Sequence, residues 1–216
     1  MKHLLFFGLL FLASSLFSQD KKTYFLNEKL TSISKEAFWD DENSCEATCN
    51  TLRLQYNLDT ADFYVKVSRL HDGTISKDSL LLLKKDLELS SGSKIDSTNL
   101  IVIDFYPRKD ECNSGGSSTR YKTKRYHEKY LKKLHSLAPV SQFSIYGKPE
   151  GLERYGGFKI WKPDLNSRVK NNFFPLDYPC GSVVVICPDG HFMSYFGEYS
   201  KELVWNLVKL LRPGKS

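Results

Sequence analysis

The residues best suited to chemistry lie in the stretch RKDECNSGG, residues 108–116. Cys112 follows an apolar run and precedes a predicted helix, and no second cysteine stands three residues after it. A cysteine at a helix start near basic side chains has a stabilised thiolate, which is the nucleophile in thiol exchange. Arg108 and Lys109 favour the thiolate, whereas the acidic pair directly before Cys112 opposes it. The stretch therefore indicates thiol chemistry at a single cysteine.

The residues after Cys112 suggest a second role, the binding of an anion. Successive backbone N–H groups at the start of a helix can form a nest for a phosphate or carboxylate group. The same composition is typical of a flexible loop, so both interpretations stay open. The candidate anion-binding loop consists of Asn113, Ser114, Gly115 and Gly116.

A separate cysteine pair, Cys45 and Cys49, has the CxxxC spacing in the sequence CEATC. We predict a helix capped by Ser44 that carries both cysteines, Leu52 and Tyr56 on one face. Two thiolates on one face suit copper or zinc, but the histidines at 71, 127, 135 and 191 have no ligand-like spacing to them. A local disulfide, or two half-buried apolar side chains, is the simpler interpretation. We therefore expect no metal site here and keep copper or zinc binding as an alternative.

All five cysteines lie after residue 18, and their odd number leaves at least one thiol unpaired within a monomer. Cys187 follows the apolar run VVVI, so we expect it to be a core residue.

Residues 1–18 have the features of a secretory signal peptide. A basic start is followed by the apolar run Leu4–Ala13 and a serine-rich segment before Gln19. The apolar run is short for a membrane span, although a permanent anchor helix is the alternative. We therefore expect an exported protein, periplasmic or secreted, with no stable membrane span after cleavage. Disulfides persist in such compartments.

The mature chain has ordinary globular composition. Cleavage removes Lys2 and no acidic residue, so the formal net charge falls from +6 to +5. The 41% hydrophobic and 26% charged residues of the full chain are typical of a folded protein rather than a disordered one. About 200 residues remain, which suits one domain with an extension. We predict an N-terminal extension at residues 19–60, a domain at 61–212 and a tail at 213–216.

Hydrophobic patterns predict the elements that position Cys112. The run NLIVIDFY at 99–106 predicts a strand buried on both faces, and the segment at 119–137 predicts a helix. The segment GSVVVICPDGHFMSYFG at 181–197 predicts a β-hairpin with its turn at Pro188–Gly190. The other expected elements are strands at 23–26, 61–70 and 141–147, helices at 75–89 and 200–211, and a turn at 71–73, with 148–172 left unassigned.

This order of strands and helices resembles the thioredoxin-like superfamily over roughly residues 61–212. The motif VIDFY before a short loop and a helix is similar to the strand that leads into a thioredoxin active site. The segment GSVVVICPDGHFMSYFGEYS is similar to the terminal hairpin of bacterial exported thioredoxin-like proteins. The resemblance implies an α/β fold with three layers, α/β/α, around a mixed central sheet that ends in a β-hairpin.

The chain departs from the family pattern at the active site. The family has a CxxC motif after the strand, and here Cys112 stands alone; the family's facing cis-proline position would be Gly181 or Ser182. The resemblance places Cys180 in that facing loop, opposite Cys112. A Cys112–Cys180 bridge could be a structural staple, contributing on the order of 3–4 kcal/mol. It could also be a catalytic redox pair, or the two cysteines could be unpaired.

The predicted helix at 119–137 is strongly basic. Residues 120–133 contain seven Lys or Arg residues and a single acidic residue, Glu128, with tyrosines among them. Such a face is usually only solvated, and contact with a polyanion or membrane surface is the alternative. We expect no nucleic acid partner for an exported chain.

The sequence leaves three hypotheses for function. The first is an exported thioredoxin-like protein with a degenerate active site, acting as a binding or structural module for an unknown protein partner. The second is a thiol-disulfide oxidoreductase that uses Cys112 with Cys180. The third is copper or zinc binding through Cys45 and Cys49. No nucleotide-binding glycine loop, HExxH or serine hydrolase motif is present, so we expect no cofactor.

Overall fold

A computed structural model describes residues 21–40, 50–115 and 118–212. The predicted signal peptide, the CEATC pair, Gly116 and the tail lie outside the described residues. Within the described part of the chain, no helix has the length and apolar character needed to cross a membrane.

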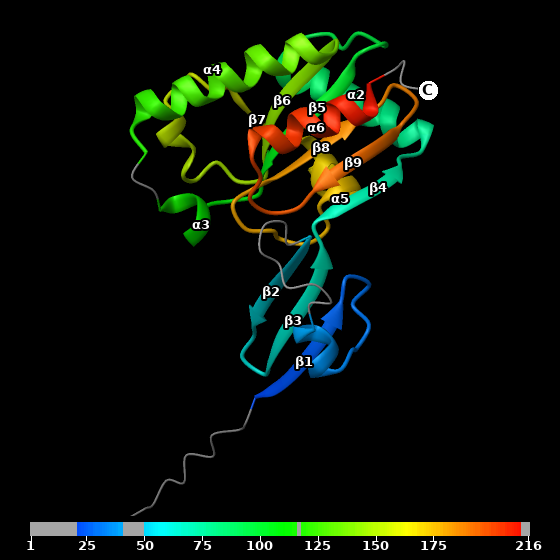
Figure 1. The fold of residues 1–216 in the computed structure, drawn as a ribbon, viewed down its shortest axis with the longest axis vertical. Coiled ribbons are helices and arrows are strands. Elements are labelled where there is room, and N and C mark those ends of the chain that lie inside the picture. Colours follow the sequence, from blue (N-terminus) through cyan, green and yellow to red (C-terminus); the bar gives the residue numbers. More distant parts are fainter. Residues whose placement is uncertain (1–20, 41–49, 116–117, 213–216) are drawn as a thin grey trace, which may run out of the picture.

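The larger of two sheets has six strands in the order β4-β9-β8-β5-β6-β7 (Figure 1). β5, β6 and β7 run parallel to one another, whereas β5/β8, β8/β9 and β9/β4 are antiparallel pairs. The predicted hairpin is therefore confirmed, and it lies between β5 and β4. The strands are β4 (Leu70–Thr74), β5 (Leu100–Tyr106), β6 (Val140–Tyr146), β7 (Trp161–Pro163), β8 (Ser182–Ile186) and β9 (His191–Tyr195).

β5 is buried along its whole length, as its apolar sequence predicts. Ile101, Ile103 and Phe105 belong to one core cluster, and Leu100 and Val102 belong to a second. Because neighbouring strand residues point to opposite faces, the two clusters lie on opposite sides of the sheet. Helices α2 (Lys77–Ser91) and α5 (Arg168–Phe173) contribute buried side chains to the first cluster. Helices α4 (Arg120–Leu137) and α6 (Lys201–Leu211) contribute to the second.

The run β5-α4-β6-α5-β8-β9-α6, with strand order β6-β5-β8-β9, forms a mixed α/β unit that is compatible with a thioredoxin-like fold. The segment that the sequence left unassigned contains two 3₁₀ helices, η1 (Leu152–Tyr155) and η2 (Leu165–Ser167), as well as β7 and α5. These short elements bring aromatic side chains of the segment close to the end of β5, for example Trp161 beside Tyr106.

The smaller sheet has three strands in the order β1-β3-β2 and lies at the end of the molecule away from α4 (Figure 1). β3 pairs parallel with β1 and antiparallel with β2. Its apolar side chains, such as Val65 and Val67, join the core cluster of α2 and α5. The elements are β1 (Lys22–Asn27), α1 (Lys35–Trp39), β2 (Thr51–Asn57) and β3 (Ala61–Ser68).

The helix predicted around Leu52 and Tyr56 is wrong for residues 51–57, which form β2. Leu54 is buried, and Leu52 and Tyr56 pack against the same core cluster. Side chains two residues apart share one face of a strand, and side chains four residues apart share one face of a helix. The spacing of four between Leu52 and Tyr56 therefore fits both a strand and a helix. The pairing with β3 decides in favour of the strand.

The turn predicted at 71–73 is also wrong, because these residues lie within β4 and pair with β9. The expected strand at 61–70 divides instead at Arg69, with β3 before it and β4 after it. Gly73 fits β4 because a Cβ atom there would stand 2.8 Å from the Phe192 ring. Because the chain divides at Arg69, β3 pairs within the smaller sheet and β4 is an edge strand of the larger sheet.

Replacing the N-cap of α2 should cost about 1 kcal/mol of stability. The Ser76 hydroxyl accepts a hydrogen bond from the Ser79 backbone N–H at 3.2 Å, and Ser76→Ala removes that acceptor. Chemical denaturation measures the loss. Ser76→Asp keeps an acceptor and should match the wild-type free energy of unfolding, whereas equal losses in both variants would contradict a capping role.

Candidate functional site

The short helix α3 (Glu111–Ser114) presents Cys112 directly after β5. Asp110 caps this helix, because its carboxylate accepts a hydrogen bond from the Asn113 N–H at 2.7 Å. The Asn113 side-chain oxygen accepts in turn from the Asp110 N–H at 3.0 Å, which closes a capping box. This reciprocal pair holds a helix of only four residues in place and leaves Cys112 exposed to solvent.

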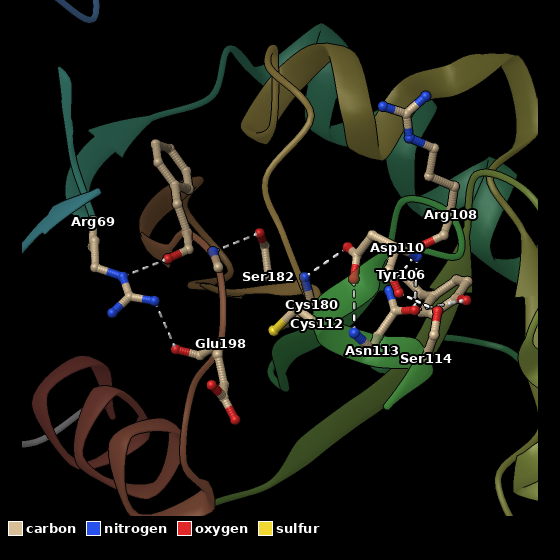
Figure 2. The surroundings of a disulfide bond; sticks show 12 residues. Arg69, Tyr106, Arg108, Asp110, Cys112, Asn113, Ser114, Cys180, Ser182 and Glu198 are labelled. Carbon is tan, nitrogen blue, oxygen red and sulfur yellow. Dashed lines mark hydrogen bonds between the residues drawn. A yellow bond between two sulfur atoms is a disulfide. The ribbon is translucent and has the colours of Figure 1, made fainter. Parts of the chain in front are cut away.

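A disulfide joins Cys112 to Cys180, which lies 68 residues away in the loop before β8 (Figure 2). The two Cα atoms are 5.0 Å apart, within the usual range for a disulfide. Cys180 is half-buried and has a left-handed backbone with a φ of 68°. The described residues contain no cis peptide bond, and Gly181, at the facing position, has a φ of 144°. The facing loop thus contributes a sulfur atom.

Asp110 also holds the two cysteine loops together without the disulfide. Its second carboxylate oxygen accepts a hydrogen bond from the Cys180 N–H at 2.8 Å (Figure 2). Hydrogen bonds to a charged acceptor are about twice as strong as neutral ones. One carboxylate therefore caps the helix that carries Cys112 and also binds the backbone of Cys180, so reduction of the disulfide leaves a direct link between the loops.

A cavity of about 270 Å³ opens beside the disulfide. Cys180 and Gly181 lie on its wall, and most of the remaining wall is aromatic. The cavity is large enough for one side chain of a partner but small for a drug-sized ligand. Its aromatic lining consists of Phe105, Tyr106, Tyr126, Tyr130, Tyr155, Phe158, Trp161 and Tyr199.

Asp104 of β5 is the buried charge of this cavity, with 2% of its surface exposed. Its carboxylate lies 2.9 Å from the ammonium group of Lys159, whose side chain is 13% exposed. One carboxylate oxygen accepts hydrogen bonds from the hydroxyls of Tyr199 at 2.8 Å and Tyr130 at 3.3 Å. The other also accepts from the Gln142 amide at 3.1 Å. Burying a carboxylate this deeply costs free energy unless such ion-pair and hydrogen-bond partners compensate for the lost water.

The tyrosines that contact Asp104 have raised pKa values, which keep their hydroxyls in the protonated form that can donate hydrogen bonds. Burial, together with the Asp104 charge, raises the pKa values of Tyr130 and Tyr199 well above the usual range, so both hydroxyls stay protonated donors. Burial likewise raises the pKa of Tyr106 to about 12. The Lys159 ammonium also lies 4.3 Å from the centre of the Trp161 ring, a cation–π contact.

Stability should fall when the pH drops below about 6.5, and His127 should account for part of the loss. Burial, and then the positive charge of Lys159, lowers the pKa of His127 below its ordinary value of 6.5. The unfolded chain therefore binds a proton before the folded chain does, which favours unfolding as the pH decreases through the unfolded-state value.

Unfolding free energies of the wild type, His127→Gln and His135→Gln at pH 7.5 and pH 5.5 test this. His135 is an exposed histidine on the same helix. The pH-dependent loss should shrink in His127→Gln and persist in His135→Gln. An unchanged pH dependence in His127→Gln would contradict the assignment.

The candidate anion-binding loop stays a prediction. The Asn113 side chain is engaged inside the protein, because its amide donates to the Arg108 carbonyl at 2.8 Å and its oxygen completes the capping box. The Ser114 hydroxyl donates to the Asp110 carbonyl. A depression beside the loop is nevertheless lined by three basic side chains, Lys109, Arg120 and Arg154, together with the acidic Glu153.

Cys187 has the environment of a structural thiol. It is half-buried and packs against the core cluster of α4 and α6. Burial raises the pKa of its thiol, which makes the reactive thiolate scarcer. It is not part of the Cys112–Cys180 site.

Glu198 completes the surroundings of the disulfide, and sequence reasoning did not identify it. Arg69 holds its segment through hydrogen bonds from the guanidinium to the carbonyls of Phe196 at 3.0 Å and Glu198 at 3.2 Å (Figure 2). Asp104 and Lys159 were also missed. An aspartate within the apolar run LIVIDFY is a detectable signal, since a buried strand rarely carries a charge without a purpose.

No family model matches the chain, and no curated protein matches it. Among solved structures, the chain is similar to one described as the "Structure of MTB dsbF in its mixed oxidized and reduced forms". The alignment covers 53% of this chain and 81% of that chain, with 12% sequence identity and a TM-score of 0.34.

Proposed function

We propose that this chain is an exported thioredoxin-like protein whose Cys112–Cys180 disulfide exchanges with the thiols of a partner. The observation that supports this most strongly is the position of the disulfide at the wall of an aromatic cavity, with Cys112 exposed and Cys180 half-buried. A staple does not need an accessible sulfur atom or a cavity beside it. An exchanging disulfide needs both, because the attacking thiolate must reach one sulfur atom and its carrier must bind next to it.

The proposed exchange begins at the exposed sulfur. A partner thiolate attacks Cys112 Sγ, a mixed disulfide forms, and Cys180 leaves with the electron pair of the broken S–S bond and takes up a proton. A second partner thiolate then attacks the partner sulfur of the mixed disulfide and releases Cys112. The partner is oxidised by two electrons to a disulfide, and the chain is reduced to two thiols.

This site would be degenerate relative to the usual CxxC arrangement, since its second sulfur comes from the facing loop. Asp110 supports such a site because it keeps the two loops close after reduction. A high effective concentration of one thiol near the other favours closing of the disulfide. The layering of helices on both faces of the mixed sheet agrees with a thioredoxin-like α/β/α arrangement.

Export is part of the same proposal. The predicted signal peptide at residues 1–18 and the disulfide both suit the periplasm or the extracellular space, where disulfides form and persist. We also propose an extension at residues 19–60 and a domain at 61–212. The first strand of that domain, β3, pairs with β1 and β2 of the extension.

A trapping experiment tests the exchange. Cys180→Ser removes the sulfur that would resolve the mixed disulfide, so incubation with glutathione disulfide should add one glutathionyl group at Cys112, located by peptide mass spectrometry. Cys187→Ser, which keeps both site cysteines, should acquire no stable adduct at Cys112. Absence of an adduct at Cys112 in folded Cys180→Ser protein would overturn the proposal.

The cavity favours a second candidate, a binding module in which the disulfide is only a staple. Its aromatic wall and the buried Asp104–Lys159 pair would suit the apolar or aromatic side chain of a protein partner. Full partner binding with no exchange at Cys112 would support this candidate over the first. The Tyr155→Ala change, which removes part of the wall, should weaken such binding.

A further inference from the structure

A third metal-ligating group stands next to the two sulfur atoms. A carboxylate oxygen of Glu198 and the sulfur atoms of Cys112 and Cys180 all lie within 4.8 Å of one another. In Figure 2 the two cysteines stand between Asp110 on one side and the Glu198 segment on the other. Over residues 21–40, 50–115 and 118–212, the Glu198 carboxylate has neither a hydrogen bond nor an ion pair, so it is available to a ligand.

The backbones that carry these three groups are held by bonds other than the disulfide. The Asp110 carboxylate holds the Cys180 N–H, and the Arg69 guanidinium holds the Glu198 carbonyl. The neighbouring Gly197 N–H donates to the buried Ser182 hydroxyl at 3.2 Å. The three groups should therefore stay together once the disulfide is opened.

We propose that the reduced protein binds one Zn²⁺ ion through the thiolates of Cys112 and Cys180 and the carboxylate of Glu198. Tetrahedral zinc, with Zn–S bonds of about 2.3 Å and a Zn–O bond of about 2.1 Å, places the two sulfur atoms about 3.8 Å apart and sulfur and oxygen about 3.6 Å apart. The Cα separation of 5.0 Å leaves room for two unbonded sulfur atoms at that spacing, and the carboxylate needs to move by little more than about 1 Å. The inference depends on the proposed function only in requiring that the disulfide can be reduced.

The ligand set selects zinc over softer and harder ions. Two thiolates exclude magnesium and calcium, which prefer oxygen ligands. A carboxylate is a poor ligand for copper(I), whereas zinc accepts sulfur and oxygen together. Three protein ligands leave a fourth position for water or a partner group. Cys180 and Glu198 both line the aromatic cavity, so that position lies near it.

Zinc binding and the disulfide exclude one another, since each needs the same two sulfur atoms. Oxidation by a low-molecular-weight disulfide would transfer two electrons from the bound thiolates, form the Cys112–Cys180 bond and leave the oxidant as two thiolates. Zn²⁺ would leave without a change in its own charge. The site would therefore hold the dithiol in its reduced form until an oxidant arrives.

Zinc titration of the full mature chain tests this. The protein is reduced with a phosphine, freed of reductant without oxygen, and assayed for thiols at Cys112 and Cys180 by alkylation and mass spectrometry. Zn²⁺ is then added in competition with a chromophoric chelator. We expect one high-affinity ion per reduced chain and no such ion in the oxidised chain.

Variants identify the ligands. Cys112→Ser and Cys180→Ser should lose the ion, and Glu198→Gln should weaken binding by roughly tenfold or more. Glu198→Gln leaves both cysteines in place, so its folding is not at risk. Glu202→Gln alters an exposed carboxylate of α6 next to Lys201 and should leave the affinity unchanged.

Two results would overturn the zinc site. One is an affinity in Glu198→Gln equal to that of the wild type. The other is loss of the ion in the double variant Cys45→Ser/Cys49→Ser, which should retain it. If thiols appear at Cys112 and Cys180 but no zinc binds, only the zinc site fails. If the two cysteines stay bonded in the folded protein, the proposed exchange fails together with it.

Discussion

Asp104→Ala should destabilise the protein by about 3–5 kcal/mol, the usual cost of breaking a buried ion pair. The substitution leaves the Lys159 ammonium without its 2.9 Å partner and removes the acceptor of the Tyr130 and Tyr199 hydroxyls. The ammonium and the two hydroxyls then lose their shared partner at once, and the Gln142 amide loses one of its acceptors. Urea denaturation followed by tryptophan fluorescence measures the change in unfolding free energy.

A double-mutant cycle separates the ion pair from general damage. Lys159→Met keeps an unbranched side chain beside Trp161 and should by itself be strongly destabilising, because it leaves the Asp104 charge unpaired. The double variant should lose clearly less than the sum of the two single losses. Strict additivity, or a loss below about 1 kcal/mol for Asp104→Ala, would contradict the described network.

Cys112→Ser should reduce catalysed thiol exchange to the background rate. In an insulin reduction assay driven by dithiothreitol, the wild type should accelerate precipitation of the insulin chains. Serine cannot form the mixed disulfide, because the thiolate is the nucleophile and the sulfur is the atom attacked. The expected effect is therefore complete loss rather than a graded decrease.

Two controls accompany that assay. Cys187→Ser changes the half-buried thiol that packs against the second core cluster and should keep wild-type turnover. Cys45→Ser/Cys49→Ser should keep it as well. If turnover survives in Cys112→Ser and disappears in the Cys45→Ser/Cys49→Ser variant, the exchange belongs to the CEATC pair, and the proposal for Cys112 and Cys180 is wrong.

Local patterns were sufficient for the central part of the fold. β5 could be predicted from its continuous apolar run, the β8–β9 hairpin from the Pro188–Asp189–Gly190 turn, and α6 from its amphipathic pattern after Ser200. The hairpin and α6 have a turn signal or a period that favours one structure, and the short length and β-branched residues of the β5 run favour a strand over a helix. The prediction for β2 was wrong because its apolar residues fit both a helix period and a strand period. The prediction for β4 was wrong because a glycine within an edge strand resembles a turn.

The candidate site could be predicted only in part. The resemblance to thioredoxin-like proteins placed Cys180 opposite Cys112, and the two are joined in the structure. Glu198 and Lys159 could not be found in this way, since each reaches the site through a connection that has no sequence period. Glu198 depends on Arg69, from the junction of the two sheets, and Lys159 lies in the segment that the sequence left unassigned.

The equilibrium reduction potential of the Cys112–Cys180 disulfide tests the proposed exchange most directly. The folded protein is equilibrated in a series of glutathione buffers, quenched by alkylation and mapped by mass spectrometry. An exchanging disulfide should be half-reduced near about −200 mV, in the range of oxidoreductases. A disulfide that remains oxidised to below about −300 mV would be a structural staple and would contradict the account.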